Sequence, residues 1–142
     1  MSNFGKNELG FFENAPLKAG VLIGVLPLPL HYRLPHEDSV LLAALTVVII
    51  ASIYIGYAFN DGRRHILATE SMAATLFLGA AWFGLKGHEW AIIAAYGAHG
   101  LWDLAHHTIV GTHMPRWYIP LCAVVDWIIA AGLYLMWYPN SF

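Results

Sequence analysis

The chain has 142 residues, of which 58% are hydrophobic and only 11% charged, and its formal net charge is −2. About a quarter of the residues of a soluble domain are charged, and the apolar stretch 40–51 has no polar face, so this composition excludes a soluble helical bundle. The charge is too small for a nucleic-acid partner, and the single Cys122 excludes an internal disulfide. The composition predicts an all-α fold, a small polytopic transmembrane helical bundle.

The first apolar segment covers about residues 15–31 and is interrupted at both ends. Residues 1–14 before it are polar and mixed in charge, so we do not expect a cleavable signal peptide. Lys18 lies near its start, and Pro27 and Pro29 break its end. Its clean apolar part is shorter than the roughly 17–25 residues that span a bilayer. We favour a kinked crossing helix, which gives about five helices, over a re-entrant segment, which leaves four.

The second and third segments cover about residues 39–59 and 65–86. Ser39 is a candidate N-cap for the second helix, and Tyr54 and Tyr57 near its end suit an interfacial aromatic belt. The third segment contains Glu70 and many alanines and glycines, which allow helices to approach closely in lipid.

The fourth and fifth segments cover about residues 89–110 and 116–138. Gly97 and Gly100 are expected to let a neighbouring helix pack against the fourth segment, and Asp126 lies near the middle of the fifth. With no long linker or low-complexity tract, residues 1–142 are predicted to form a single integral membrane domain.

The distribution of basic residues predicts the orientation. With five crossings, the side that holds the N-terminus carries five cationic residues, Lys6, Lys18, Arg63, Arg64 and Arg116. The other side carries Arg33 and Lys86. The positive-inside rule then predicts a multi-pass protein of the cell inner (cytoplasmic) membrane, with its N-terminus in the cytoplasm and its C-terminus outside.

Four ionisable residues interrupt the fourth apolar segment, in the stretch 96–107. At about 100° per residue, His99, Asp103 and His106 fall within an arc of about 60°, with His107 on its flank. Burying such a cluster in lipid is costly unless its members pair, face water or hold an ion. The cluster is therefore the candidate functional site.

The depth of a residue in the membrane can be estimated from its position along its helix. By this estimate, ionisable residues of other segments lie at the same depths as those of the fourth segment. At about 1.5 Å per residue from the side of Arg64, Glu70 lies about 9 Å deep and Asp103 about 10 Å deep. His99 and Asp126 lie deeper, near 15 Å. We therefore expect two layers, in which Asp126 faces His99 and Glu70 faces Asp103 or His106.

Three histidines and up to three carboxylates suit a transition metal such as zinc or iron. In this interpretation His99, His106 and His107 are ligands, and Asp103, Asp126 and Glu70 are ligands, orienting groups or a general base, with catalytic roles for Asp103 and Glu70. A buried polar network and a proton or ion pathway are the alternatives. The spacing differs from the His-Glu-x-x-His zinc motif, and no other crossing helix has a central histidine to complete a heme site.

Several polar residues have a simpler interpretation. Glu70 can instead pair with Arg63 or Arg64 at the membrane surface. The histidines in loops or at helix ends are expected to face water: His31, His36, His65, His88 and His113.

Six stretches together resemble a family of short bacterial polytopic membrane proteins catalogued only as a domain of unknown function: residues 53–58, Asp61-Gly62-Arg63, Glu70, residues 97–107, residues 115–118 and residues 122–126. The resemblance covers roughly residue 39 to the C-terminus and implies a small helical membrane protein, without supplying a substrate. The site chemistry is also similar to that of the alkaline ceramidase-like transmembrane zinc hydrolases. Those enzymes carry a His-x-x-x-His pair, which this chain lacks, so the similarity concerns chemistry only.

Three functions follow from these observations. The first is a metal-binding membrane protein, of which a metal-dependent hydrolase or oxidase acting on a lipid-soluble substrate is the more specific form. The second is a small carrier of protons, ions or metal, although the polar groups cluster in one half of the bilayer. The third is a structural or accessory subunit. The expected partners are the lipid bilayer and either a second copy or another membrane protein.

Overall fold

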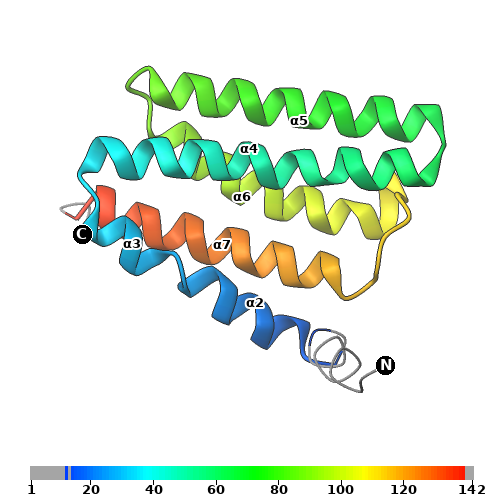
Figure 1. Cartoon of the computed structure of the whole chain (residues 1–142), viewed down its shortest axis with the longest axis horizontal. Helices are drawn as coiled ribbons and strands as arrows, with labels where there is room; N and C mark the ends of the chain where they lie inside the picture. Colours follow the sequence, from blue (N-terminus) through cyan, green and yellow to red (C-terminus); the bar gives the residue numbers. More distant parts are fainter. Residues whose placement is uncertain (1–11, 13, 140–142) are drawn as a thin grey trace, which may run out of the picture.

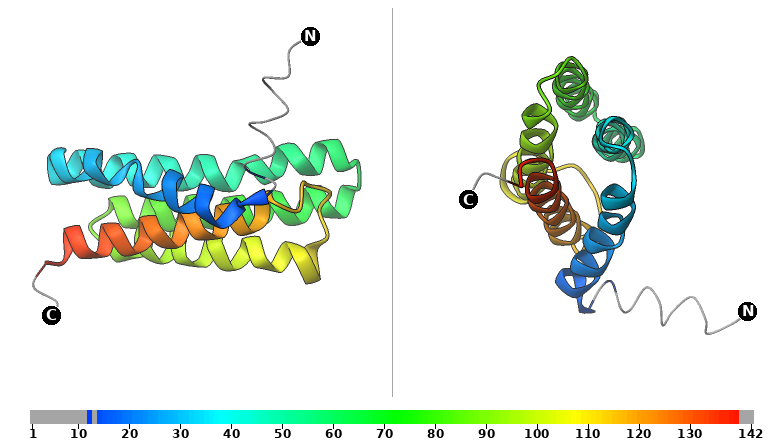
Figure 2. Two further views of the ribbon diagram at one scale, coloured as in Figure 1. Left: turned by 90° about the horizontal axis from the view of Figure 1, so that it is seen from below. Right: turned by 90° about the vertical axis from the view of Figure 1, so that its left-hand side faces the viewer.

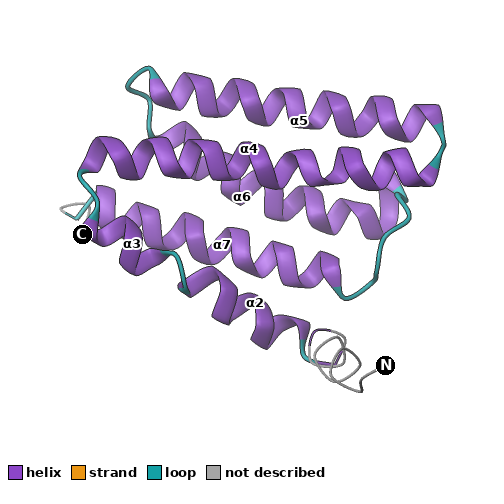
Figure 3. Ribbon diagram, viewed as in Figure 1, coloured by secondary structure: helices purple, strands orange, loops and turns teal. Residues whose placement is uncertain are grey.

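The structure is a computed structural model that describes residues 12 and 14–139, with the side chain of His107 excepted. All regular secondary structure in these residues is helical, which confirms the predicted all-α class (Figure 3). The prediction that the N-terminal stretch is not a signal peptide falls almost wholly outside the described residues.

The chain forms a bundle of roughly parallel and antiparallel helices (Figure 1). In chain order the elements are α2 (Pro16–Val25), α3 (Leu28–Arg33), α4 (His36–Asp61), α5 (Arg64–Leu85), α6 (Trp90–Ala105), the π-helical turn η1 (His106–Val110) and α7 (Tyr118–Trp137). α4 packs chiefly against α5, and α7 packs against both α6 and α2. Viewed from its end, the bundle has α4, α5, α6 and α7 around a shared interior (Figure 2).

Three of the described helices are long and apolar enough to cross a membrane, namely α4, α5 and α7. The 16 residues of α6 continue directly into the 5 residues of η1, so the fourth apolar segment is also one continuous helical rod. The chain is therefore a polytopic helical membrane protein, as the composition predicts.

The first apolar segment is broken, as its prolines predict. α2 ends at Val25, and α3 begins at Leu28 and continues only to Arg33. The two short helices run beside α7 along the bundle (Figure 1). Gly20 and Gly24 lie against α7, where a Cβ on Gly20 would stand 2.8 Å from the Leu121 carbonyl oxygen. This Gly-x-x-x-Gly pair lets α2 lie unusually close to α7.

Helix α4 is longer than predicted, and two predictions about it are wrong. It begins at His36, so Ser39 is not its N-cap; Ser39 is buried and bonds to His31 and to the indole of Trp137. Because α4 continues to Asp61, Tyr54 lies two turns inside the helix and is 1% exposed. Tyr54 therefore belongs to the bundle interior and not to an interfacial belt.

An ion pair fixes the turn between α4 and α5. Gly62 ends α4 with a φ of 78°, the left-handed conformation that glycine adopts without strain. Arg63 then donates to Asp61 from Nε at 2.6 Å and from Nη2 at 2.8 Å, and also to the Gly111 carbonyl at 2.7 Å. The carboxylate raises the pKa of the Arg63 guanidinium by this direct bonding. The ion pair thus joins the α4–α5 turn to the loop after η1.

Candidate metal centre

Gly100 on α6 allows α6 and α7 to approach each other closely. A Cβ on Gly100 would stand 2.5 Å from Nε1 of Trp127, so only a glycine leaves room for that indole. The indole also donates to the Gly97 carbonyl at 3.2 Å. Asp126, the residue before Trp127 on α7, contacts the same helix through His99. Gly100 thus gives the predicted close packing, and Gly97 contributes its carbonyl.

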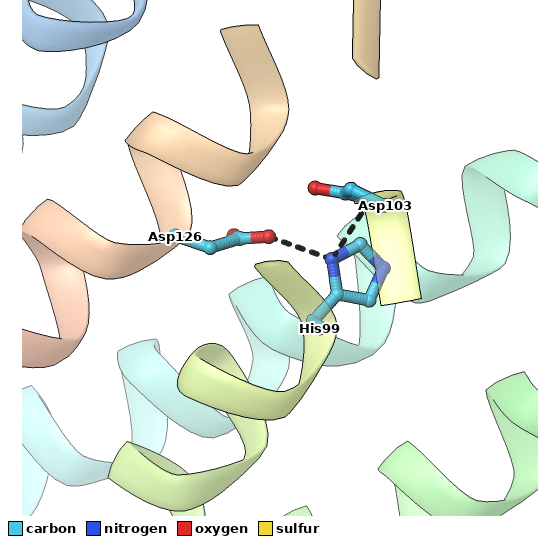
Figure 4. Close-up of side chains that lie close together, drawn as sticks. All are labelled: His99, Asp103 and Asp126. Atoms are coloured by element: carbon cyan, nitrogen blue, oxygen red, sulfur yellow. Dashed lines mark hydrogen bonds and ion pairs between the residues drawn. The ribbon is translucent and has the colours of Figure 1, made fainter. Parts of the chain in front are cut away.

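His99, Asp103 and Asp126 form the inner cluster (Figure 4). His99 Nδ1 donates to Asp126 Oδ2 at 2.7 Å, across from α6 to α7. The same nitrogen lies 3.6 Å from Asp103 Oδ1, one helical turn along α6. All three side chains are at most 1% exposed. The interior of a membrane bundle therefore holds one imidazole between two carboxylates.

Tyr54 on α4 completes this arrangement, and the sequence-based interpretation missed it. Its hydroxyl donates to Asp103 Oδ1 in a short hydrogen bond. Its ring lies against His99, with 5.6 Å between centroids, and stacks on His106 at 4.3 Å. The depth argument could have found it, since Tyr54 precedes Arg63 by nine residues and so lies about 13 Å deep.

Three polar atoms of the inner cluster have no hydrogen-bond partner among the described residues: His99 Nε2, Asp103 Oδ2 and Asp126 Oδ1. Buried polar atoms are nearly always paired in folded proteins, so each such atom needs a reason. One ligand atom from each of these residues lies within 4.8 Å of those of the other two. The inner cluster is thus a group that could hold a metal ion.

Glu70 and His106 form a separate outer pair. Glu70 on α5 bonds to His106 Nε2 at 2.7 Å, and it accepts from Thr112 at 2.6 Å and from the Trp102 indole at 3.3 Å. Both Glu70 and His106 are buried. Glu70 has all its oxygens engaged, unlike the carboxylates of the inner cluster.

The hydrogen bonds of His106 show where its protons are. Nδ1 lies 2.8 Å from the Trp102 carbonyl oxygen, which can only accept, so Nδ1 carries a hydrogen. Nε2 faces the Glu70 carboxyl group, so one further proton lies between them. Neither nitrogen keeps a lone pair for a metal while these bonds hold.

The predicted two-layer arrangement is confirmed. Asp126 faces His99, and Glu70 faces His106. The alternative in which Glu70 pairs with Arg63 or Arg64 is wrong, since Arg63 pairs with Asp61. One water-facing prediction is also wrong, because His31 is buried and bonds to Ser39 at 2.9 Å.

The structure brings together His99, Asp103 and Asp126 of the predicted site residues and sets Glu70 and His106 apart as a pair. The side chain of His107 lies outside the described part of the chain. Thr112, which also reaches Glu70, comes from a loop and carries no periodic signal in the sequence. The ligand and catalytic roles assigned to these residues stay predictions.

A polar cavity of about 500 Å³ lies beside the outer pair. It is lined by residues of the loop between η1 and α7 and its surroundings: His106, Gly111, Thr112, His113, Met114, Arg116 and Ile119. The Arg63–Asp61 ion pair holds this loop through Gly111 and through the His113 amide, which donates to Asp61 at 3.0 Å. The site therefore has its polar approach at the end of the bundle where α4 meets α5.

Comparison with known proteins identifies the family of the chain but gives no activity. No curated protein and no solved structure matches the chain. One family model, described as a family of unknown function (DUF6010), matches residues 16–138. That match includes every element from α2 to α7 and all residues of the inner cluster and the outer pair. The chain therefore belongs to the DUF6010 family of unknown function.

Proposed function

We propose that this protein is a metal-binding integral membrane protein whose ion is held by His99, Asp103 and Asp126. The observation that carries the proposal is the inner cluster: three buried side chains from two helices bring one ligand atom each to within 4.8 Å of one another. Each of them also has one polar atom that meets no hydrogen-bond partner among the residues that the structure describes. Intramembrane ionisable residues are by default functional candidates.

Charge supports a cation at this place. Two carboxylates brought close repel each other unless a cation or a shared proton lies between them. His99 Nδ1 can donate one hydrogen, and that bond goes to Asp126. Asp103 accepts from the Tyr54 hydroxyl, and its carboxyl group also lies against that of Asp126. A bound divalent cation would compensate both negative charges and occupy the unpaired oxygens.

The donor set favours zinc or iron. Imidazole and carboxylate are common ligands of both metals, and three protein ligands leave a coordination position open for chemistry. A metal at such a site activates a bound water or polarises a substrate oxygen. Tyr54 would orient Asp103 through its hydrogen bond, as groups around metal ligands commonly do. The finer proposal is a hydrolase or oxidase acting on a lipid-soluble substrate.

In this proposal Glu70 and His106 serve as the acid–base pair. They share one proton, and His106 stacks on the Tyr54 ring, whose hydroxyl reaches Asp103. The polar cavity beside His106 gives a route for water and protons from one membrane surface. Phosphate or nucleotide chemistry has no support, since the inner cluster contains no cationic side chain other than the imidazole.

A carrier of protons or ions is the second candidate. It is favoured by the unbroken series of contacts from the polar cavity through His106 and Tyr54 to Asp103. Flux of protons or divalent cations into proteoliposomes would support it. If the protein contained metal but transported neither protons nor divalent cations, the result would favour the metal-dependent enzyme over the carrier.

The arrangement of the helices supports five crossings. α2 starts beside the beginning of α7, on the side of the bundle toward which α4 runs, and α3 finishes where α4 starts (Figure 1). With Arg63, Arg64 and Arg116 at one end, the proposed orientation has the N-terminus in the cytoplasm and the C-terminus outside, in a cytoplasmic membrane.

Metal content of the detergent-purified protein tests the proposal. We expect about one zinc or iron ion per chain by elemental mass spectrometry, lost in His99→Ala and Asp126→Asn because each removes a ligand. His88→Ala and His36→Ala should keep the ion, since both side chains lie outside the inner cluster. Equal loss in all four variants would mean adventitious binding, and a metal-free wild-type protein would refute the proposal.

A further inference from the structure

An apolar groove runs along the outside of the bundle between α5 and α6. It has a volume of about 650 Å³. Residues that define it include Met72, Leu76 and Phe77 of α5 and Ala94, Ala98 and Leu101 of α6. Met72, Leu76 and Leu101 are each more than 60% exposed, so the groove opens sideways toward the lipid.

The groove offers no unpaired polar group of its own. Its one hydroxyl, on Thr69, donates to the His65 carbonyl at 2.9 Å. The Trp102 indole, which also lines it, donates to Glu70. Whatever occupies the groove is therefore recognised by apolar contact alone.

The length and the lining of the groove fit a hydrocarbon chain. Its lining on α6 extends from Trp90 to Ala105, which is about 22 Å at 1.5 Å per residue. The side chains along this length are almost all apolar, as a hydrocarbon chain requires. Packing of a second copy along α5 and α6 is the other outcome, which crosslinks between two copies would reveal.

Two aromatic side chains that line the groove, Phe77 and Trp102, also contact the buried polar residues. The Phe77 ring lies edge-on against His99, with 4.9 Å between centroids. Trp102 lies between the groove and Glu70. A single aromatic side chain thus separates the apolar groove from the imidazole whose Nε2 has no partner among the described residues.

We propose that the groove binds one hydrocarbon chain of a lipid-soluble substrate for the metal centre, with Phe77 as the partition between the chain and His99. This inference rests on the proposed function and names its substrate class. The chain lies parallel to the helices, as lipid chains do, and passes Phe77 near the middle of the groove.

A photoreactive chain tests this proposal. The probe is a palmitic acid analogue that carries a diazirine at mid-chain, added to the detergent-purified full-length protein and mapped by peptide mass spectrometry. We expect labelling that saturates, is displaced by excess palmitic acid and falls on α5 and α6. Ala98→Trp should reduce it about tenfold or more, because the indole takes the space of the chain.

Ala131→Trp is the matched control, since Ala131 is also an exposed alanine of a long apolar helix but lies outside the groove. It should leave the labelling unchanged. Phe77→Ala should extend the labelling to His99, whereas Leu78→Ala, an exposed neighbour on α5, should not. Labelling that does not saturate, that persists in Ala98→Trp or that spreads evenly over the bundle would overturn the groove proposal. Crosslinks between two copies along α5 and α6 would do so as well.

Metal content measured on the same samples keeps the two proposals apart. Saturable labelling of a metal-free protein would refute the metal site and leave the groove as a chain-binding site. A metal-loaded protein without saturable labelling would refute the groove alone.

Discussion

At the scale of single residues, Tyr54 connects the two polar groups of the bundle. Its ring stacks on His106 of the outer pair, and its hydroxyl donates to Asp103 of the inner cluster. The outer pair is saturated with hydrogen bonds, whereas three atoms of the inner cluster have no partner in the described part of the chain. This difference is the reason why we propose proton transfer for the outer pair and ion binding for the inner cluster.

Replacing Tyr54 tests its bond to Asp103. Tyr54→Phe keeps the ring but removes the hydroxyl that donates to Asp103, and hydrogen bonds to charged groups contribute about 1.5–3 kcal/mol. We expect a free energy of unfolding lower by about that amount, measured by reversible denaturation in detergent. Tyr57→Phe is the control and should change little, since Tyr57 is only half-buried and contacts Tyr54 and Tyr118 through its ring, which the substitution keeps. Equal effects of the two variants would contradict this role.

The residue pairs were partly predictable from the sequence. A constant rise per residue was enough to match Asp126 with His99 and Glu70 with His106, since the helices are nearly straight and aligned. Tyr54 was assigned to the interface because the predicted helix ended too early. Thr112 could not be found, because its approach to Glu70 depends on the path of a loop.

At the scale of elements, glycines decide which helices approach closely. Gly20 and Gly24 allow α2 to dock on α7, and Gly100 admits Trp127 between α6 and α7. The site depends on the second contact, since Trp127 is the neighbour of Asp126. The proline break between α2 and α3 followed from the sequence, whereas the face on which α2 packs did not, because its apolar residues surround it evenly.

Two glycine variants on one helix test this account. Gly100→Ala places a Cβ against the Trp127 indole, and we expect overpacking to cost roughly 1–3 kcal/mol and to lower metal content by moving Asp126. Gly97→Ala meets no atom within 4 Å and should stabilise α6 by up to about 1 kcal/mol. Thermal melts and metal content of both variants check the prediction. If neither Gly100→Ala nor Gly97→Ala lowered the stability or the metal content, Trp127 would not position the site.

At the level of the whole molecule, the buried cluster and the buried pair lie toward the end of the bundle where α4 meets α5, and the outer faces of the long helices are largely apolar. The polar cavity lies at the end where Arg63 and Arg116 are found, and the groove between α5 and α6 opens to lipid. Water and a hydrocarbon chain would thus reach the site from different directions. Such separation suits an enzyme for lipid-soluble substrates better than a pore.

Reporter fusions test the proposed orientation. A reporter fused after Asp61 should be active only in the cytoplasm, because Arg63, Arg64 and Arg116 retain that end inside. A reporter fused after Phe142 should be active only outside, because five crossings separate the two termini. Cytoplasmic activity of both fusions would contradict five crossings. It would indicate that the first segment is re-entrant and does not cross the membrane.

A thermal melt in detergent, with and without a strong chelator, shows whether a cation is bound between the two buried carboxylates. The wild-type protein should melt at a higher temperature with metal, since a ligand at 100 times its dissociation constant adds about 2.7 kcal/mol. Asp103→Asn keeps an acceptor for Tyr54 but removes one negative charge, so in chelator it should be at least as stable as the wild type. With metal present it should be less stable than the wild type, because it has lost a ligand. If the chelator changes the melting of neither protein, the inner cluster holds no ion and is a buried polar network.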